Sequence, residues 1–159
     1  MPFRLGGVLV LCVWAAACNW DVLIVSPGAV VVGGEPTLAL HPVSPFPQTV
    51  PIPSCPSVQP ATARFEIVLS NGRVDHDLDR IDVSFADRNG SAGSSLSFTS
   101  SEIVRDFGST TVASGRSRTI VIVLGVGCGT MTSGTIVVHV RLHDVSGKSV
   151  MLSDRIAVS

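Results

Sequence analysis

Hydrophobic residues recur at every second position over most of the C-terminal two thirds of the chain. In residues 63–72, Phe65, Ile67 and Leu69 share one face of an extended chain. The same alternation appears in three further segments, residues 80–90, 135–144 and 149–159. A period of two is typical of β-strands with one buried face. Two of these segments end in Asn-Gly, the dipeptide best suited to turns that require positive φ.

Two segments depart from this alternation. Residues 118–127 are apolar on both faces, which is expected of a central strand that is covered on each side. Thr99 and Glu102 have the spacing of a capping box, and Gly108 follows as a stop signal. We therefore expect one short helix at about residues 100–107.

Several strands separated by turns predict an all-β protein with an antiparallel β-sandwich. The pattern of residues 55–159 resembles an immunoglobulin-like domain. It lacks the buried tryptophan and the cysteine spacing of antibody domains, because Trp14 and Trp20 both precede this region. We expect the immunoglobulin-like sandwich, with its one short helix, to occupy residues 61–159.

The N-terminal part of the chain has a different character. Eight of the ten prolines fall in residues 36–60. Proline lacks an amide donor and fixes φ, so this stretch predicts a stiff, extended spacer. Residues 18–35 form a tether whose valine-rich runs, at residues 22–32, predict either a small hairpin or an added strand of the main sheet.

The first seventeen residues have the layout of a secretory signal peptide. Arg4 lies in a short n-region, an apolar stretch follows over residues 5–13, and three alanines precede Cys18. The apolar run is too short to cross a bilayer, which takes roughly 20 residues. The sequence therefore predicts a signal peptide over residues 1–17 and an exported protein.

The junction Ala15-Ala16-Ala17-Cys18 resembles the lipobox of bacterial lipoproteins. That resemblance implies that Cys18 carries a diacylglycerol and usually an acylated amino group, which would anchor the protein to a bacterial membrane with its body in the periplasm or the extracellular space. Ala15 stands where a large aliphatic residue is more common. The same letters also fit an A-x-A site for the general signal peptidase. Either cut makes Cys18 the first residue of the mature chain.

The four cysteines agree with export. Cys12 leaves with the signal peptide and Cys18 is the predicted lipid site, so Cys55 and Cys128 remain as a pair. In an oxidising compartment this pair predicts a disulfide, and two buried free thiols are the alternative. Closing a loop of about 74 residues would stabilise the fold by roughly 4 kcal/mol.

Charge excludes two classes of partner. The net charge is -1, and the basic residues are scattered along the chain. We therefore expect no nucleic-acid partner and no polybasic membrane patch. We also expect no cofactor.

Two stretches carry candidate chemistry. Asp75, Asp77 and Asp79 have the first spacings of an EF-hand calcium loop, but the later glycine and glutamate positions hold other residues, so they are weak metal candidates. The simpler interpretation is a solvated turn between Leu69 and Ile81. His139 and His143 flank Arg141 on one face of a strand. These histidines are about 13 to 14 Å apart, too far to share one metal, and predict a polar stripe or the rim of a contact surface.

These observations predict a non-enzymatic structural or binding module of the cell envelope, whose partner is a protein or a glycan. Binding residues of a sandwich often gather in loops, and three loops are the first candidates: residues 75–79, 89–94 and 125–134. One alternative is a calcium-dependent adhesin or carbohydrate-binding domain. A second is a small secreted hydrolase, although the G-x-S-x-G signature of one serine-hydrolase class is missing from the sequence.

Overall fold

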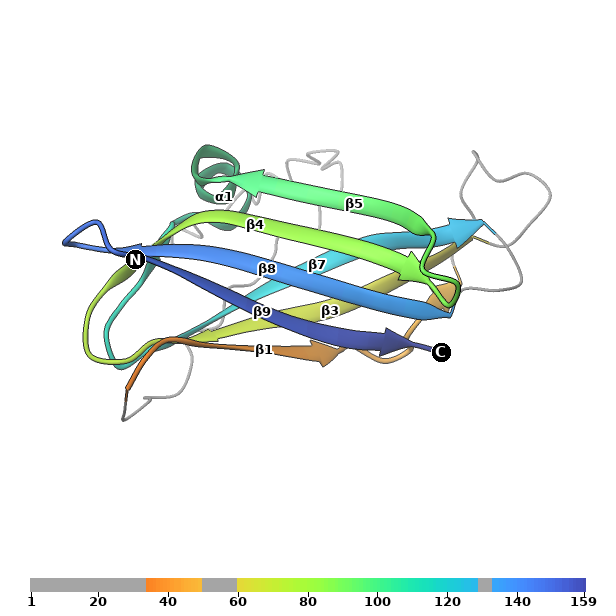
Figure 1. Ribbon diagram of the computed structural model, residues 1–159, viewed down its shortest axis with the longest axis horizontal. Helices are drawn as coiled ribbons and strands as arrows, with labels where there is room; N and C mark the ends of the chain where they lie inside the picture. The colour runs from red at the N-terminus through yellow and green to blue at the C-terminus, as the bar shows by residue number, and fades with distance from the viewer. Residues whose placement is uncertain (1–33, 50–59, 129–132) are drawn as a thin grey trace, which may run out of the picture.

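The computed structural model describes residues 34–49, 60–128 and 133–159. Within these residues, the chain forms two antiparallel β-sheets packed face to face, with one short helix (Figure 1). The predicted all-β sandwich is therefore confirmed. The predicted signal peptide, most of the tether and Cys55 lie outside the described residues.

The first sheet is built around β3 (Pro60–Ser70). Along one edge, β3 pairs with β7 (Ser117–Cys128) over its whole length. Along the other edge it pairs with β1 (Thr37–Pro42) and then with the short β2 (Gln48–Thr49). β3 is thus the central strand of this sheet.

The second sheet has four long strands in the order β5 (Ala92–Thr99), β4 (His76–Asp87), β8 (Gly134–Asp144) and β9 (Ser149–Val158). A two-residue strand, β6 (Thr111–Val112), pairs with the beginning of β4. β4 and β8 are therefore its central strands.

The connections match those of an immunoglobulin-like sandwich. Hairpins join β4 to β5 and β8 to β9 within the second sheet, whereas the chain crosses between the sheets after β3, before β7 and after β7. This mixture gives a Greek-key arrangement. At one side of the sandwich, the amide of Leu40 in β1 donates a hydrogen bond of 3.0 Å to Asp154 Oδ2 in β9. The edges of the two sheets are thus joined directly.

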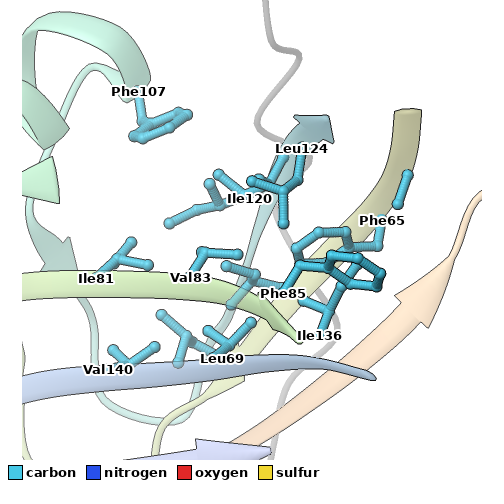
Figure 2. Close-up of a cluster of buried hydrophobic side chains, with 14 of the residues drawn as sticks. Phe65, Leu69, Ile81, Val83, Phe85, Phe107, Ile120, Leu124, Ile136 and Val140 are labelled. Carbon is cyan, nitrogen blue, oxygen red and sulfur yellow. The ribbon is translucent and has the colours of Figure 1, made fainter. Parts of the chain in front are cut away.

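The core lies between the two sheets and consists of aliphatic and phenylalanine side chains. Phe65 and Ile67 of β3 are 0% exposed, as are Ile136 and Val140 of β8. Figure 2 shows this cluster, with side chains from the strands of both sheets filling the space between them. Each such burial contributes about 1.5 to 3 kcal/mol, so the alternation of the sequence is the main source of stability.

The spacer predicted for residues 36–60 is wrong for its first part. Residues 37–42 form β1, and Leu38 and Leu40 pack against the core. Proline is tolerated here because β1 is an edge strand whose last residue, Pro42, ends the pairing. Residues 50–59 lie outside the described residues. The sandwich therefore begins at Thr37, 24 residues before the predicted boundary at residue 61.

The position of β7 also differs from the prediction. The sequence predicts a central strand for residues 118–127, yet β7 lies at an edge, since among the described strands only β3 pairs with it. Its inward residues, such as Ile120 and Ile122, are buried, whereas the outward Val123 is 54% exposed. The apolar pattern identifies the strand correctly but not its place in the sheet.

The predicted helix is confirmed as α1 (Ser100–Phe107). Glu102 Oε2 accepts a hydrogen bond of 2.8 Å from the amide of Thr99, as the capping box requires. Gly108 ends the helix with φ of 82°, a conformation that glycine adopts without strain. The buried Phe107 ring packs edge-on against Phe98 of β5, at 5.4 Å between ring centroids.

The capping box makes helix stability dependent on pH. The hydrogen bond from the Thr99 amide lowers the pKa of Glu102 below its ordinary value. A lowered folded-state pKa adds stability above the ordinary value, and this stability is lost as the pH falls through the folded-state value. We therefore expect Glu102→Gln to lower the Tm at about pH 7 and to leave it nearly unchanged at about pH 3, in thermal melts followed by circular dichroism.

Glu66→Gln, on the outward face of β3, is the matched control because Glu66 takes no part in the cap. An equal loss of Tm for Glu102→Gln at both pH values would contradict the assignment.

Candidate functional site

The outward face of the second sheet gathers charged and polar side chains from three neighbouring strands. We call this surface the polar face. It consists of Asp77, Asp79, Arg80 and Asp82 on β4, of His139, Arg141 and His143 on β8, and of Met151, Ser153 and Arg155 on β9.

Strand geometry explains why these residues share a face. Successive side chains of a strand point to opposite sides, so the buried Val138, Val140 and Leu142 force their neighbours on β8 outward. His139 and Arg141 are exposed as a result. The predicted stripe of His139, Arg141 and His143 on one face is therefore confirmed, and it runs along a central strand of the sheet.

The charges on the polar face form two adjacent rows. The acidic row lies on β4 and is interrupted by Arg80, and a row of two histidines and one arginine lies on β8. His143 stands opposite Asp77, His139 opposite Asp82, and Arg141 opposite Arg80. The register shifts between Leu78 and Arg80, which leaves Asp79 as an extra residue. Arg141 Nε donates to Asp79 Oδ2 across the strands. The ion pair between Asp79 and Arg141 thus joins the two rows.

Within the acidic row, the carboxyl group of Asp82 is held in its charged form. Partial burial opposes ionisation there, but hydrogen bonds from Arg80 and Ser97, with the charges of Arg80 and His139, lower the pKa of the carboxyl. Arg80 Nε lies 2.8 Å from both carboxylate oxygens of Asp82. The face therefore presents fixed negative and positive charges side by side at neutral pH.

The weak calcium candidates are spread over a loop and a strand. Asp75 lies in the turn before β4, and its Oδ1 accepts a 2.7 Å hydrogen bond from the amide of Ser114. Asp77 Oδ1 accepts a hydrogen bond of 2.7 Å from Thr111 Oγ1, while Asp79 binds Arg141. The predicted solvated turn is therefore too long, because β4 begins at His76. Within the described ranges, no three His, Cys, Asp or Glu side chains are placed to hold one metal ion.

The three candidate loops do not meet. Residues 75–79 lie where β4 begins, whereas residues 89–94 follow its last residue, Asp87, about 36 Å away along a twelve-residue strand. Asp87 also pairs with Gly134, so residues 125–134 approach the same end as residues 89–94, although 129–132 lie outside the described residues. A single loop site formed by all three is therefore excluded by the topology.

A buried polar cluster surrounds β6 and was missed by sequence reasoning. Asn71 donates to Val112 O at 2.5 Å, Arg118 Nη2 donates to Phe107 O at 3.1 Å, and His76 Nδ1 lies 3.1 Å from Val74 O. Burial lowers the pKa of Arg118. The one sequence signal for this cluster was Arg118, an arginine at an inward position of the apolar strand β7. Arg118 thus ties the helix to β7, Asn71 ties its loop to β6, and His76 is buried at the beginning of β4.

No protein-family model and no curated protein sequence matches the chain. Among solved structures, it is similar to the X-ray structure of Northeast Structural Genomics Consortium target SoR45, with a TM-score of 0.56 and 14% sequence identity. The match covers 78% of this chain and 87% of that chain. At this identity the likeness shows the fold alone.

The ion pair on the polar face contributes little to folding. The side chains of Arg141 and Asp79 are 45% and 37% exposed, so solvent screens their attraction. In a double-mutant cycle with Asp79→Asn and Arg141→Gln, we expect a coupling energy below about 1 kcal/mol, measured by urea unfolding. A coupling of several kcal/mol would instead assign the pair a structural role.

Proposed function

We propose that the protein is an exported, lipid-anchored module of the bacterial cell envelope that binds a partner protein through the polar face. One observation supports this most: charged side chains of β4, β8 and β9 lie side by side, outward and accessible, on one sheet. Exposed charge pairs add little to stability, so their gathering on one face favours recognition. The proposal is non-enzymatic and requires no cofactor.

The composition of the face favours a protein partner over a glycan. Arginine and methionine are enriched in protein interfaces, and the face offers Arg141, Arg155 and Met151, the last of which is 60% exposed. Aromatic rings that stack on sugars are missing from the face as defined above. Carboxylates and arginines placed side by side on this face give a partner both orientation and specificity.

In this proposal, the membrane anchor is a lipid group on Cys18. Each buried methylene contributes about 0.8 kcal/mol, and two or more acyl chains hold a protein stably at a membrane. Because β1 belongs to the sandwich, the proposed tether would consist of residues 19–36 and would span at most roughly 60 Å. Across the described ranges, no helix has the length and apolar character needed to cross a membrane.

The disulfide between Cys55 and Cys128 stays a prediction, because Cys55 lies outside the described residues. Its position is compatible with the backbone. Cys128 pairs with Pro60 at the beginning of β3, and Cys55 precedes Pro60 by five residues. Five residues span at most about 17 Å, so a chain that starts at Pro60 can bring Cys55 to Cys128.

The anchor is tested by the mass of the N-terminal peptide, isolated from the membrane and soluble fractions of the native host. We expect Cys18 to carry acyl chains in the membrane fraction, and Cys18→Ala to move the protein out of it. An unmodified Cys18 in the soluble fraction would mean ordinary secretion and would remove the anchor from the proposal.

The binding face is tested by photo-crosslinking in the native host. A photoreactive residue at Ser153, on the polar face, is expected to give one discrete crosslinked product, while the same probe at Arg64, on the outward face of β3, gives none. Reversing two charges with Arg141→Glu and Arg155→Glu should reduce that product by about tenfold or more.

Arg64→Glu is the matched charge reversal on the other sheet and should leave the product unchanged. Equal crosslinking from Ser153 and Arg64, or an unchanged yield in the double variant, would assign the binding site elsewhere.

A further inference from the structure

The chain contains two Asn-Gly dipeptides, Asn71-Gly72 and Asn89-Gly90, and the fold places them in opposite environments. An asparagine that precedes a glycine can modify itself, because the glycine nitrogen lies within reach of the side-chain carbonyl carbon and no Cβ hinders the attack. The attack needs a carboxamide that can rotate and a glycine amide that can lose its proton to water. The two dipeptides differ in both respects.

The carboxamide of Asn71 is locked in the buried polar cluster. Asn71 is 1% exposed, and its Nδ2 donates to Val74 O at 2.7 Å and to Val112 O at 2.5 Å. Its Oδ1 accepts the amide of Gly72 at 3.0 Å, and Gly72 is buried as well. Reaction at Asn71 therefore requires the loop to leave the core.

Asn89 lies instead in the exposed turn between β4 and β5 (Figure 1). No hydrogen bond joins its carboxamide to another described residue. The amide of Gly90 donates to Asp87 O at 3.0 Å, and Asp87 Oδ1 accepts the amides of Asn89 and Ser91, at 2.8 Å each. Opening of this turn is therefore the one restraint that the described structure places on the reaction.

The turn between β8 and β9 repeats this geometry without an asparagine. Asp144 Oδ1 accepts the amides of Ser146 and Lys148, at 2.8 and 2.9 Å. Gly147 has φ of 81°, and Gly90 has φ of 78°. Ser146 stands where the β4–β5 turn has its asparagine. The two turns thus share a backbone and differ in chemistry, so the β8–β9 turn is a matched control.

We propose that Asn89 is a self-modification site in the folded protein. The nitrogen of Gly90 bonds to the side-chain carbonyl carbon of Asn89, and the carboxamide nitrogen leaves as ammonia, taking up the proton that the Gly90 amide loses. The product is a cyclic imide. Water then opens the ring at either carbonyl and gives aspartate or isoaspartate. The reaction consumes only water and needs no oxidant and no cofactor.

Either product changes the β4–β5 turn. Both add one negative charge to a chain whose net charge is -1, and they add it two residues from Asp87, whose carboxylate holds the turn. Isoaspartate also lengthens the backbone of the turn by one carbon. The modification would therefore loosen this hairpin while the protein ages. It depends neither on the lipid anchor nor on the binding function proposed above.

The test is incubation of the protein, purified from the native host, in mildly alkaline buffer. Peptide mass spectrometry with chromatographic separation of isoaspartate follows both sites. We expect the Asn89 peptide to convert at least about tenfold faster than the Asn71 peptide, because Asn71 reacts only after local unfolding. In concentrated urea the two rates should become similar, since both sites are then exposed Asn-Gly dipeptides.

Two matched variants test the role of the turn. Asp87→Ala should speed the reaction at Asn89 by about threefold or more, because the Gly90 amide is released more often when the turn loses its acceptor. Asp144→Ala removes the equivalent acceptor of the β8–β9 turn and should leave the rate at Asn89 unchanged. Circular dichroism of both variants checks that the sandwich remains folded.

Three outcomes would overturn the proposal. Equal rates at the two sites in the folded protein would show that the fold does not select Asn89. A contrast that persists in urea would assign the difference to the local sequence. A glycan on Asn89 would also overturn it, because Asn89-Gly90-Ser91 fits an N-glycosylation acceptor and the nitrogen would no longer be free to leave as ammonia.

Discussion

The packing of the two sheets against each other is the interaction on which the rest of the structure depends. Phe65 and Ile67 from one sheet and Ile136 and Val138 from the other are almost fully removed from water. This burial supplies the driving force that fixes which face of every strand points inward. A shift of register by one residue would turn each of these side chains into solvent. The outward residues are therefore set as firmly as the core.

The polar face follows from that constraint. His139 and Arg141 are exposed because Val138 and Val140 are not, and the pairing of β8 with β4 then brings Arg141 to Asp79. The candidate site is consequently carried by strands rather than by loops. Two of its three strands, β4 and β8, are rigid, since their backbones are fixed on both sides by hydrogen bonds. In the proposed function, such a site would bind a partner by preformed charge and shape, with little ordering cost on association.

The sequence alone was sufficient for features that depend on local periodicity or local chemistry. Alternation predicted the inward faces of the strands around Phe65 and Val138, and the pairing of Thr99 with Glu102 predicted the only helix in the described part of the chain. It failed where long-range pairing decides the outcome. The many prolines of residues 36–60 predicted a spacer in place of β1. A strand can form there because an edge position tolerates proline, whereas a central strand does not.

The same limit explains the remaining differences. The apolar sequence of residues 118–127 predicts a central strand. Whether β7 has a second neighbour depends on the topology of the sheet and not on the side chains of β7 itself. Arg118 likewise has no local signal for its role, because the carbonyl of Phe107 that it contacts comes from the helix eleven residues earlier. The charge rows were visible only as separate motifs, since the register that places Asp82 opposite His139 cannot be read from either strand alone.

The position of β1 determines how the polar face would be oriented at a membrane in the proposed function. β1 begins at the end of the sandwich where β3 finishes and β4 starts, so the proposed tether would leave the sandwich at that end. The turn between β8 and β9 lies at the same end, and the turn between β4 and β5 lies at the opposite end. The β8–β9 turn would then face the membrane, and a partner would approach the polar face from the end that carries the β4–β5 turn.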